Sequence, residues 1–71
     1  MKYVVIYEKT ATGYSAYVPD LPGCVTTGGT LEETKANMRE AIGGHIEAMR
    51  LHGEPIPEPT TVAAEQVAFP A

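Results

Sequence analysis

Side chains that could carry out catalysis are few in this sequence. Cys24 is the single cysteine, and the two histidines, His45 and His52, follow in the second half of the chain. A cysteine nucleophile needs a histidine beside it as its base, and nothing in this spacing brings either histidine to Cys24. We therefore expect Cys24 to be a small buried apolar side chain. With one cysteine, no disulfide forms within the chain.

Metal and carboxylate chemistry has equally little support. His45 and His52 are seven residues apart, which on a helix separates them by about 10.5 Å, too far to share one ion without other ligands. No HExxH or CxxC motif is present, and Ser15 lies outside a GxSxG motif. A two-metal nuclease needs clustered carboxylates, whereas the expected strands carry only Glu8 and Glu65. We predict a protein that is not an enzyme and holds no metal or cofactor.

Glycines in front of a helix could instead bind an anion. Gly28 and Gly29 directly precede Thr30-Leu31-Glu32-Glu33, and amides at a helix N-terminus attract phosphate. These four residues form a capping box, in which the Thr30 hydroxyl accepts from the Glu33 amide while Glu33 reaches back. Because two acidic residues would repel a phosphate there, we interpret the stretch as a turn and a helix cap.

The elements expected around these residues form a single α+β domain over residues 1–71. Composition predicts three strands at residues 2–8, 14–18 and 24–27, a helix from Leu31 to about Leu51, and a last short strand at 65–69. The order β-β-β-α-β predicts two layers: a three-stranded antiparallel sheet plus the last strand, with the helix on one face.

The predicted helix has one apolar face and one irregularity. The face is traced by Leu31, Met38, Ile42, His45 and Met49. Gly43 and Gly44 break the pattern, because each glycine costs about 1 kcal/mol relative to alanine in a helix. The pair either permits close approach by a sheet or another helix, or it is a tolerated weak point.

The sheet has more apolar surface than one helix can cover. Pairing Glu8 with Tyr14 places the small aliphatic residues Val4, Ile6, Ala16 and Val18 under the helix, and a slip of one residue would exchange the faces. In this register the open face carries Tyr3, Val5, Tyr7 and Tyr17. Tyrosine is frequent at protein interfaces, although its hydroxyl can also simply meet water. Because a chain of this size rarely has a sufficient core, we predict that this face binds a protein and that the chain forms a homo-oligomer.

Charge restricts the kind of partner. Five basic and nine acidic residues give a net charge of −4, whereas nucleic-acid-binding proteins carry basic surfaces. We therefore expect no direct nucleic-acid binding and a preference for a basic protein. No apolar run is long enough to span a membrane, and the start of the chain lacks a secretory signal, so we predict a cytoplasmic protein without membrane contact.

The stretch YSAYVPDLPGCVTTGGTLEE, residues 14–33, resembles the HicB family of antitoxin-like proteins. The resemblance extends to the first hairpin and to HGEPIPEP after the helix. It identifies the signature turn and helix cap as Asp20, Pro22, Gly23, Cys24, Gly28, Thr30 and Glu33, in structural roles. It also implies a partial RNase H-like fold, with a fourth strand parallel to the first.

The resemblance further implies a function. HicB-like proteins bind and silence HicA-like toxins, which are small basic ribonucleases that cleave messenger RNA, and an acidic module suits such a partner. Many family members carry a C-terminal DNA-binding domain, and since this sequence ends at Ala71 we do not expect direct operator binding. The leading hypothesis is an antitoxin that occludes a toxin. The alternatives are a solitary homo-oligomer without a toxin, and an enzyme or small-molecule binder with a pocket at the turn of residues 19–29.

Overall fold

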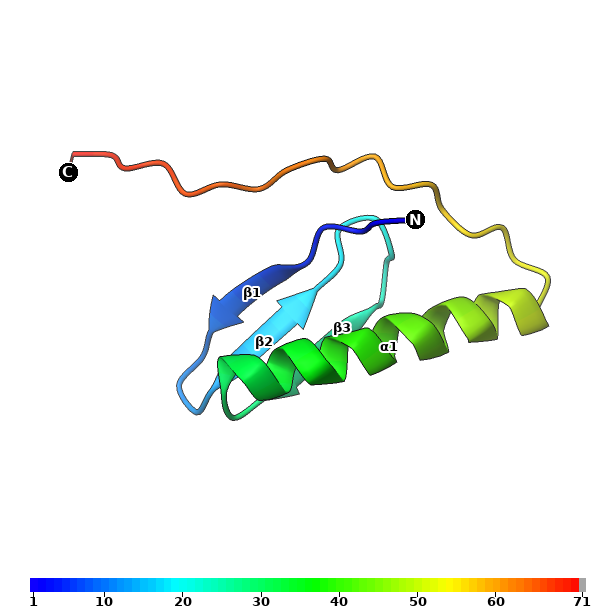
Figure 1. The fold of residues 1–71 in the computed structure, drawn as a ribbon, viewed down its shortest axis with the longest axis horizontal. Coiled ribbons are helices and arrows are strands. Elements are labelled where there is room, and N and C mark those ends of the chain that lie inside the picture. The colour runs from blue at the N-terminus through cyan, green and yellow to red at the C-terminus, as the bar shows by residue number, and fades with distance from the viewer. Residues whose placement is uncertain (71) are drawn as a thin grey trace.

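The computed structural model describes residues 1–70 and contains three strands and one helix. The strands are β1 (Ile6–Lys9), β2 (Tyr14–Tyr17) and β3 (Val25–Gly28), and the helix is α1 (Leu31–Leu51). The sheet is antiparallel in the order β1-β2-β3, and α1 lies along one of its faces (Figure 1). The predicted two-layer α+β arrangement and the helix boundaries are confirmed.

The hairpin between β1 and β2 closes through Thr10. The Thr10 backbone amide donates to the Gly13 carbonyl at 2.8 Å, and the Thr10 hydroxyl accepts from the Gly13 amide at 3.1 Å. These bonds draw the loop tight, so Lys9 pairs with Tyr14, and Glu8 lies opposite Ser15. The predicted pairing of Glu8 with Tyr14 is therefore wrong by one residue.

The shift by one residue exchanges the two faces of the sheet. Tyr7 lies opposite Ala16, which is buried. Tyr3, Val5 and Tyr7 are partly buried and pack against the core, so the prediction that they lie on the open face is corrected. Tyr17 points to the opposite face and is 40% exposed.

Helix α1 begins with the predicted capping box. The Glu33 amide donates to the Thr30 hydroxyl at 3.1 Å, and the Glu33 carboxylate accepts from the Gly29 amide at 3.1 Å. These contacts satisfy two backbone donors at the turn into the helix. They also fix the direction in which α1 leaves β3.

The end of the helix is a Schellman motif. Gly53 has φ +66°, and its amide donates to the Arg50 carbonyl at 3.1 Å, while the Glu54 amide donates to the Met49 carbonyl at 2.9 Å. Glycine suits this left-handed position because it lacks a Cβ. The predicted helix end at about Leu51 is confirmed.

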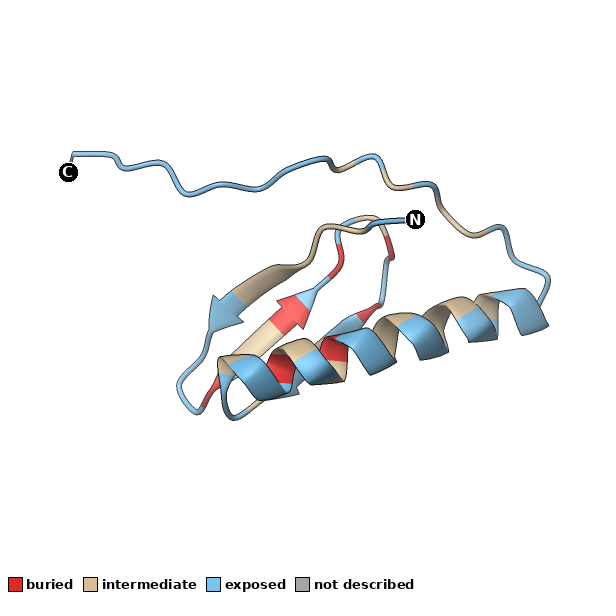
Figure 2. Cartoon of the chain, viewed as in Figure 1, coloured by how far each residue is buried: buried red, intermediate tan, exposed pale blue. Residues whose placement is uncertain are grey.

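The core is small and lies between β2, the turn that follows it, and α1. Figure 2 shows the buried residues on β2, on the turn and on the sheet-facing side of α1. The buried apolar residues are Ala16, Val18, Leu21, Cys24 and Met38. Thr34 is buried among them and donates its hydroxyl hydrogen to the Thr30 carbonyl at 2.7 Å. A core of this size leaves the chain dependent on further burial.

The chain after the helix is extended, and the predicted strand at residues 65–69 is not formed. An extended segment becomes a strand only when its backbone groups pair with a neighbour. Within residues 1–70, no backbone–backbone hydrogen bond involves residues 55–70. The segment runs in the direction of β1 without joining it (Figure 1). It is partly buried at residues 56, 57, 59 and 61 and exposed over residues 62–70 (Figure 2).

Candidate functional site

The residues considered for catalysis do not come together. Cys24 is buried, and this burial raises the pKa of its thiol, which disfavours the nucleophilic thiolate. His45 lies beside the signature turn, with its ring near Gly23. His52 is exposed and lies 3.8 Å from the Glu54 carboxylate. Among the described residues, no three potential metal ligands cluster.

The signature turn from Val18 to Cys24 is a compact backbone loop. The Val18 amide donates to the Cys24 carbonyl at 3.2 Å, and the Leu21 and Cys24 amides donate to Val18 and Leu21 carbonyls at 3.1 and 3.0 Å. Gly23 has φ +86°, a conformation that favours glycine. The turn buries Leu21 completely, so its role in the fold is to complete the core.

Asp20 has a role that the sequence did not reveal. The resemblance gave it a structural role in the signature turn, and its carboxylate accepts four hydrogen bonds from Thr60 and Thr61 at 2.9–3.2 Å. The Thr61 amide is the main reason that the pKa of Asp20 lies below its usual value of 3.8. Forty residues separate the partners, and no local sequence signal marks the contact.

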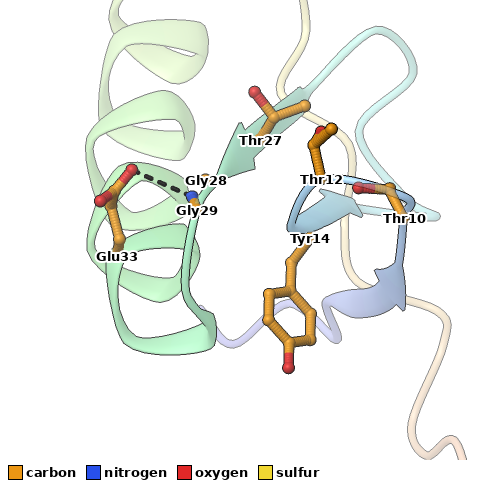
Figure 3. Close-up of a pocket in the computed structure, with 7 residues that line it drawn as sticks. All are labelled: Thr10, Thr12, Tyr14, Thr27, Gly28, Gly29 and Glu33. Carbon is orange, nitrogen blue, oxygen red and sulfur yellow. Dashed lines mark hydrogen bonds between the residues drawn. The ribbon is translucent and has the colours of Figure 1, made fainter.

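A shallow cleft of about 380 Å³ lies beside the start of α1. Figure 3 shows hairpin residues on one side and Glu33 on the other, bonded to the Gly29 amide. The cleft is lined by Thr10, Thr12, Tyr14, Thr27, Gly28, Gly29 and Glu33. Because Glu33 already accepts from Gly29, that amide is engaged within the chain. The cleft is therefore best described as the seam between the hairpin and the helix cap.

The open face of the sheet is a candidate surface for protein binding. Ile6, Tyr17 and Val25 lie directly opposite one another across the three strands, on the face turned away from α1. Tyr17 is 40% and Val25 is 64% exposed, and Ile6 is half-buried. Glu8 lies in the neighbouring row and is exposed. We call Ile6, Tyr17, Val25 and Glu8 the open-face patch.

Sequence reasoning found only one member of this patch among its interface residues. Tyr17 was predicted there, whereas Tyr3 is held inward, its hydroxyl donating to the Pro57 carbonyl at 2.6 Å. Ile6 and Val25 were missed because the assumed register placed Ile6 under the helix. The Thr10 side chain, which closes the hairpin loop, was the signal that could have corrected the register.

The helix supplies negative charge on its exposed side. Four glutamates of α1 are exposed: Glu32, Glu33, Glu40 and Glu47. The one ion pair within residues 1–70 joins His52 and Glu54, so none of these four is paired with a cation of the described chain. Carboxylates in this state can pair with a basic partner.

Within residues 1–70 the structure describes one helix, α1, and it does not combine the length and apolar character required to cross a lipid bilayer.

Comparison with known proteins gives a consistent result. A family model described as a HicB-like antitoxin of bacterial toxin–antitoxin systems matches residues 3–70. A UPF0150 protein of Thermoplasma acidophilum is 48% identical over 58 residues, covering 80% of this chain and 84% of that protein. Antitoxin HicB 2 of Photorhabdus laumondii is 32% identical over 71 residues, and this chain spans 51% of its length.

A solved structure shows the same fold. One chain of a HicA3 and HicB3 toxin–antitoxin complex superposes with a TM-score of 0.76 at 37% sequence identity. The match covers 84% of this chain and 70% of that chain.

Proposed function

Because this chain belongs to the HicB-like antitoxin family of bacterial toxin–antitoxin systems, we propose that it neutralises a HicA-like ribonuclease by binding it and covering its active surface. The solved structure that it resembles is a toxin–antitoxin complex, which supports a partner of this kind. The protein acts in the cytoplasm and holds the toxin without itself contacting nucleic acid.

The observation that carries this proposal is the uncovered open-face patch. Apolar side chains from all three strands are aligned there, and α1 covers only the opposite face. A contiguous apolar patch with an aromatic residue at its centre is typical of a protein interface. Tyr17 occupies that centre, on the middle strand of the sheet.

Electrostatics supports the choice of a basic partner. The chain carries a net charge of −4, and Glu8 lies beside the apolar row of the patch. Complementary charge speeds association and selects against wrong partners. An acidic surface that occupies a basic ribonuclease competes with the RNA backbone for the same cations.

The test is co-expression with any small basic protein encoded beside this gene, read as rescue of growth and as co-purification. We expect the native chain to rescue growth and Tyr17→Asp or Val25→Asp to lose both effects. Leu51→Asp, which also places a charge at an exposed apolar position but lies at the end of α1, is the matched control and should retain them.

The outcomes of this co-expression test distinguish an antitoxin from a solitary homo-oligomer. If no such neighbour binds or is neutralised, the chain acts as a solitary homo-oligomer, a role favoured by the exposed apolar residues of its C-terminal tail. If a toxin binds but Tyr17→Asp and Val25→Asp bind it equally well, occlusion through the open-face patch is wrong.

A further inference from the structure

The open face of the sheet presents two rows of different character. The apolar row crosses all three strands and consists of Ile6, Tyr17 and Val25. The next row, two residues along each strand, is polar and consists of Glu8, Ser15 and Thr27. Two residues of a strand span about 6.6 Å, so an apolar strip lies directly beside a strip with one carboxylate and two hydroxyl groups.

The Glu8 carboxylate has no cationic partner in its own chain. The one ion pair within residues 1–70 joins His52 and Glu54, and Glu8 is exposed. Lys9, the next residue, points to the opposite face because side chains alternate along a strand. Its ammonium group lies there, 4.9 Å from the centre of the Tyr14 ring. The negative charge on the open face is therefore not balanced within the described chain.

The exposed ring of Tyr17 belongs to the same small area. Tyr17 lies opposite Ile6, and Glu8 follows Ile6 by two residues on the same face. Tyr17 and Glu8 are thus diagonal neighbours, a separation within reach of aromatic and long side chains. Because Tyr17 is 40% exposed, a side chain from a partner can contact its ring and the Glu8 carboxylate together.

An arginine fits these two groups better than a lysine does. The guanidinium group is planar, so it stacks on an aromatic ring and donates two parallel hydrogen bonds to a carboxylate. Its other N–H groups can donate to hydroxyl oxygens, which Ser15 and Thr27 carry in the row of Glu8. A lysine ammonium is a compact and strongly hydrated charge without this plane.

We propose that Glu8 and Tyr17 form the recognition point for an arginine of the basic protein that this chain binds. The guanidinium stacks on Tyr17 and donates to Glu8, while an apolar side chain of the partner, about 6.6 Å away, covers the apolar row. The arginine then lies toward the β1–β2 hairpin and the apolar side chain toward the signature turn. The inference rests on the proposed function for the identity of the partner and adds the residue type that is recognised and its orientation.

The first test is an NMR titration with the peptide acetyl-Leu-Gly-Arg-amide, in which an apolar residue and an arginine are two positions apart. We expect this peptide, at up to about 10 mM, to shift the ring signals of Tyr17 and the amide signal of Glu8. The same peptide with lysine should give smaller shifts, and with citrulline, a neutral isostere of arginine, it should give none. The rings of Tyr3 and Tyr7 pack against the core and serve as internal references.

Two variants and a control assign the shifts to the recognition point. Glu8→Gln should abolish the response of the Tyr17 ring, and Tyr17→Leu should abolish that of the Glu8 amide. Glu58→Gln removes the same charge at an exposed position outside the sheet and should respond like the native chain. Equal shifts with the arginine and citrulline peptides, or an unchanged response in Glu8→Gln, would overturn the proposal.

The second test measures the affinity for any small basic protein, encoded beside this gene, that binds the native chain. Glu8→Gln and Tyr17→Leu should each raise the dissociation constant about tenfold or more, whereas Glu58→Gln should change it less than about twofold. If Tyr17→Asp abolishes binding but Glu8→Gln binds like the native chain, recognition of an arginine is wrong and the proposed function stands. If no such protein binds, the proposed function fails, and the peptide titration decides the recognition point without it.

Discussion

Asp20 and Thr61 are joined by two hydrogen bonds although 41 residues separate them in the sequence. The Thr61 amide donates to Oδ2 at 2.9 Å and the Thr61 hydroxyl to Oδ1 at 3.2 Å, and Thr60 makes a matching pair of bonds. The signature turn is thereby tied to the C-terminal segment that follows α1. A residue of the family signature thus holds this segment to the domain at Thr60 and Thr61.

The contact of Asp20 with Thr60 and Thr61 should make the attachment of the C-terminal segment depend on pH. The Thr61 amide, chiefly, keeps the pKa of the Asp20 carboxyl below its usual value of 3.8 in the folded protein. A carboxylate with a lowered pKa stabilises the folded contact fully above the unfolded value, about 3.9, and that stabilisation is lost as pH falls through the folded value. We expect the amides of Thr60 and Thr61 to lose hydrogen-exchange protection below about pH 4.

Asp20→Asn is the control for this effect. Both backbone amides donate to Oδ2, and the amide oxygen of asparagine can still accept them, but it carries no negative charge, and the NH2 group cannot accept from the two threonine hydroxyls as Oδ1 does. We expect the protection of Thr60 and Thr61 to be lower in Asp20→Asn and to lose the pH dependence that Asp20 causes in the native protein. The same pH step in native protein and variant would assign it to other carboxylates and contradict the role of Asp20.

Gly28 should be sensitive to alanine and Gly29 should not. A Cβ at Gly28 would lie 2.5 Å from Thr34 Oγ1 and 2.8 Å from the Thr34 amide nitrogen, at the place where β3 meets α1. Because backbone must move to make room, Gly28→Ala should lower the free energy of unfolding by about 1–3 kcal/mol. Gly29→Ala meets nothing within 4 Å and should change it by less than about 0.5 kcal/mol. Urea denaturation of both variants measures the difference, and equal values would show that β3 and α1 do not approach this closely.

The features that could be predicted from sequence are those with local causes. Thr30 and Glu33 indicate the start of α1, and Gly53 indicates its end, because caps involve residues only a few positions apart. The strands follow from β-branched and aromatic runs bounded by glycine and proline. These signals were sufficient for the element order from β1 through α1 and for the α+β class.

The features that could not be predicted depend on single contacts. The register goes with a hairpin loop in which Thr10 and Gly13 are joined by two hydrogen bonds. A slip of one residue is enough to move Tyr3 and Tyr7 between the open face and the helix side. The hydrogen bonds between Asp20 and Thr61 join segments that are 41 residues apart. No periodic pattern in the sequence links these two segments. The last strand was inferred from composition at residues 65–69, but composition does not supply the neighbour that a strand needs for its hydrogen bonds.

Met38 should be the most sensitive position of α1. It is 1% exposed and is the one apolar residue of the helix in the buried core. Met38→Ala removes contacts from a core that has few, so we expect a loss of about 2–5 kcal/mol. Leu51→Ala, at a site 77% exposed, is the control and should change stability by less than about 0.5 kcal/mol. Thermal unfolding followed by circular dichroism tests both, and a stable Met38→Ala would show that the core lies elsewhere.

Gly43 and Gly44 lower the helix propensity of α1, although no contact in the described chain requires glycine at these two positions. Both are exposed within α1, and a Cβ on either would meet nothing within 4 Å. Each alanine replaces a residue of poor helix propensity without a clash, so Gly43→Ala and Gly44→Ala should each stabilise the isolated chain by about 1 kcal/mol.

Measuring the same two variants against a toxin partner decides between the two interpretations of the glycine pair. If the pair is only a tolerated weak point, the stabilised variants should bind and rescue growth like the native chain. If binding is lost while stability rises, the glycines admit the backbone of another polypeptide, because an added methyl group is harmful only where a second surface approaches closely. A fall in the stability of the isolated chain would contradict both interpretations, since it would require a close contact within the chain at these positions.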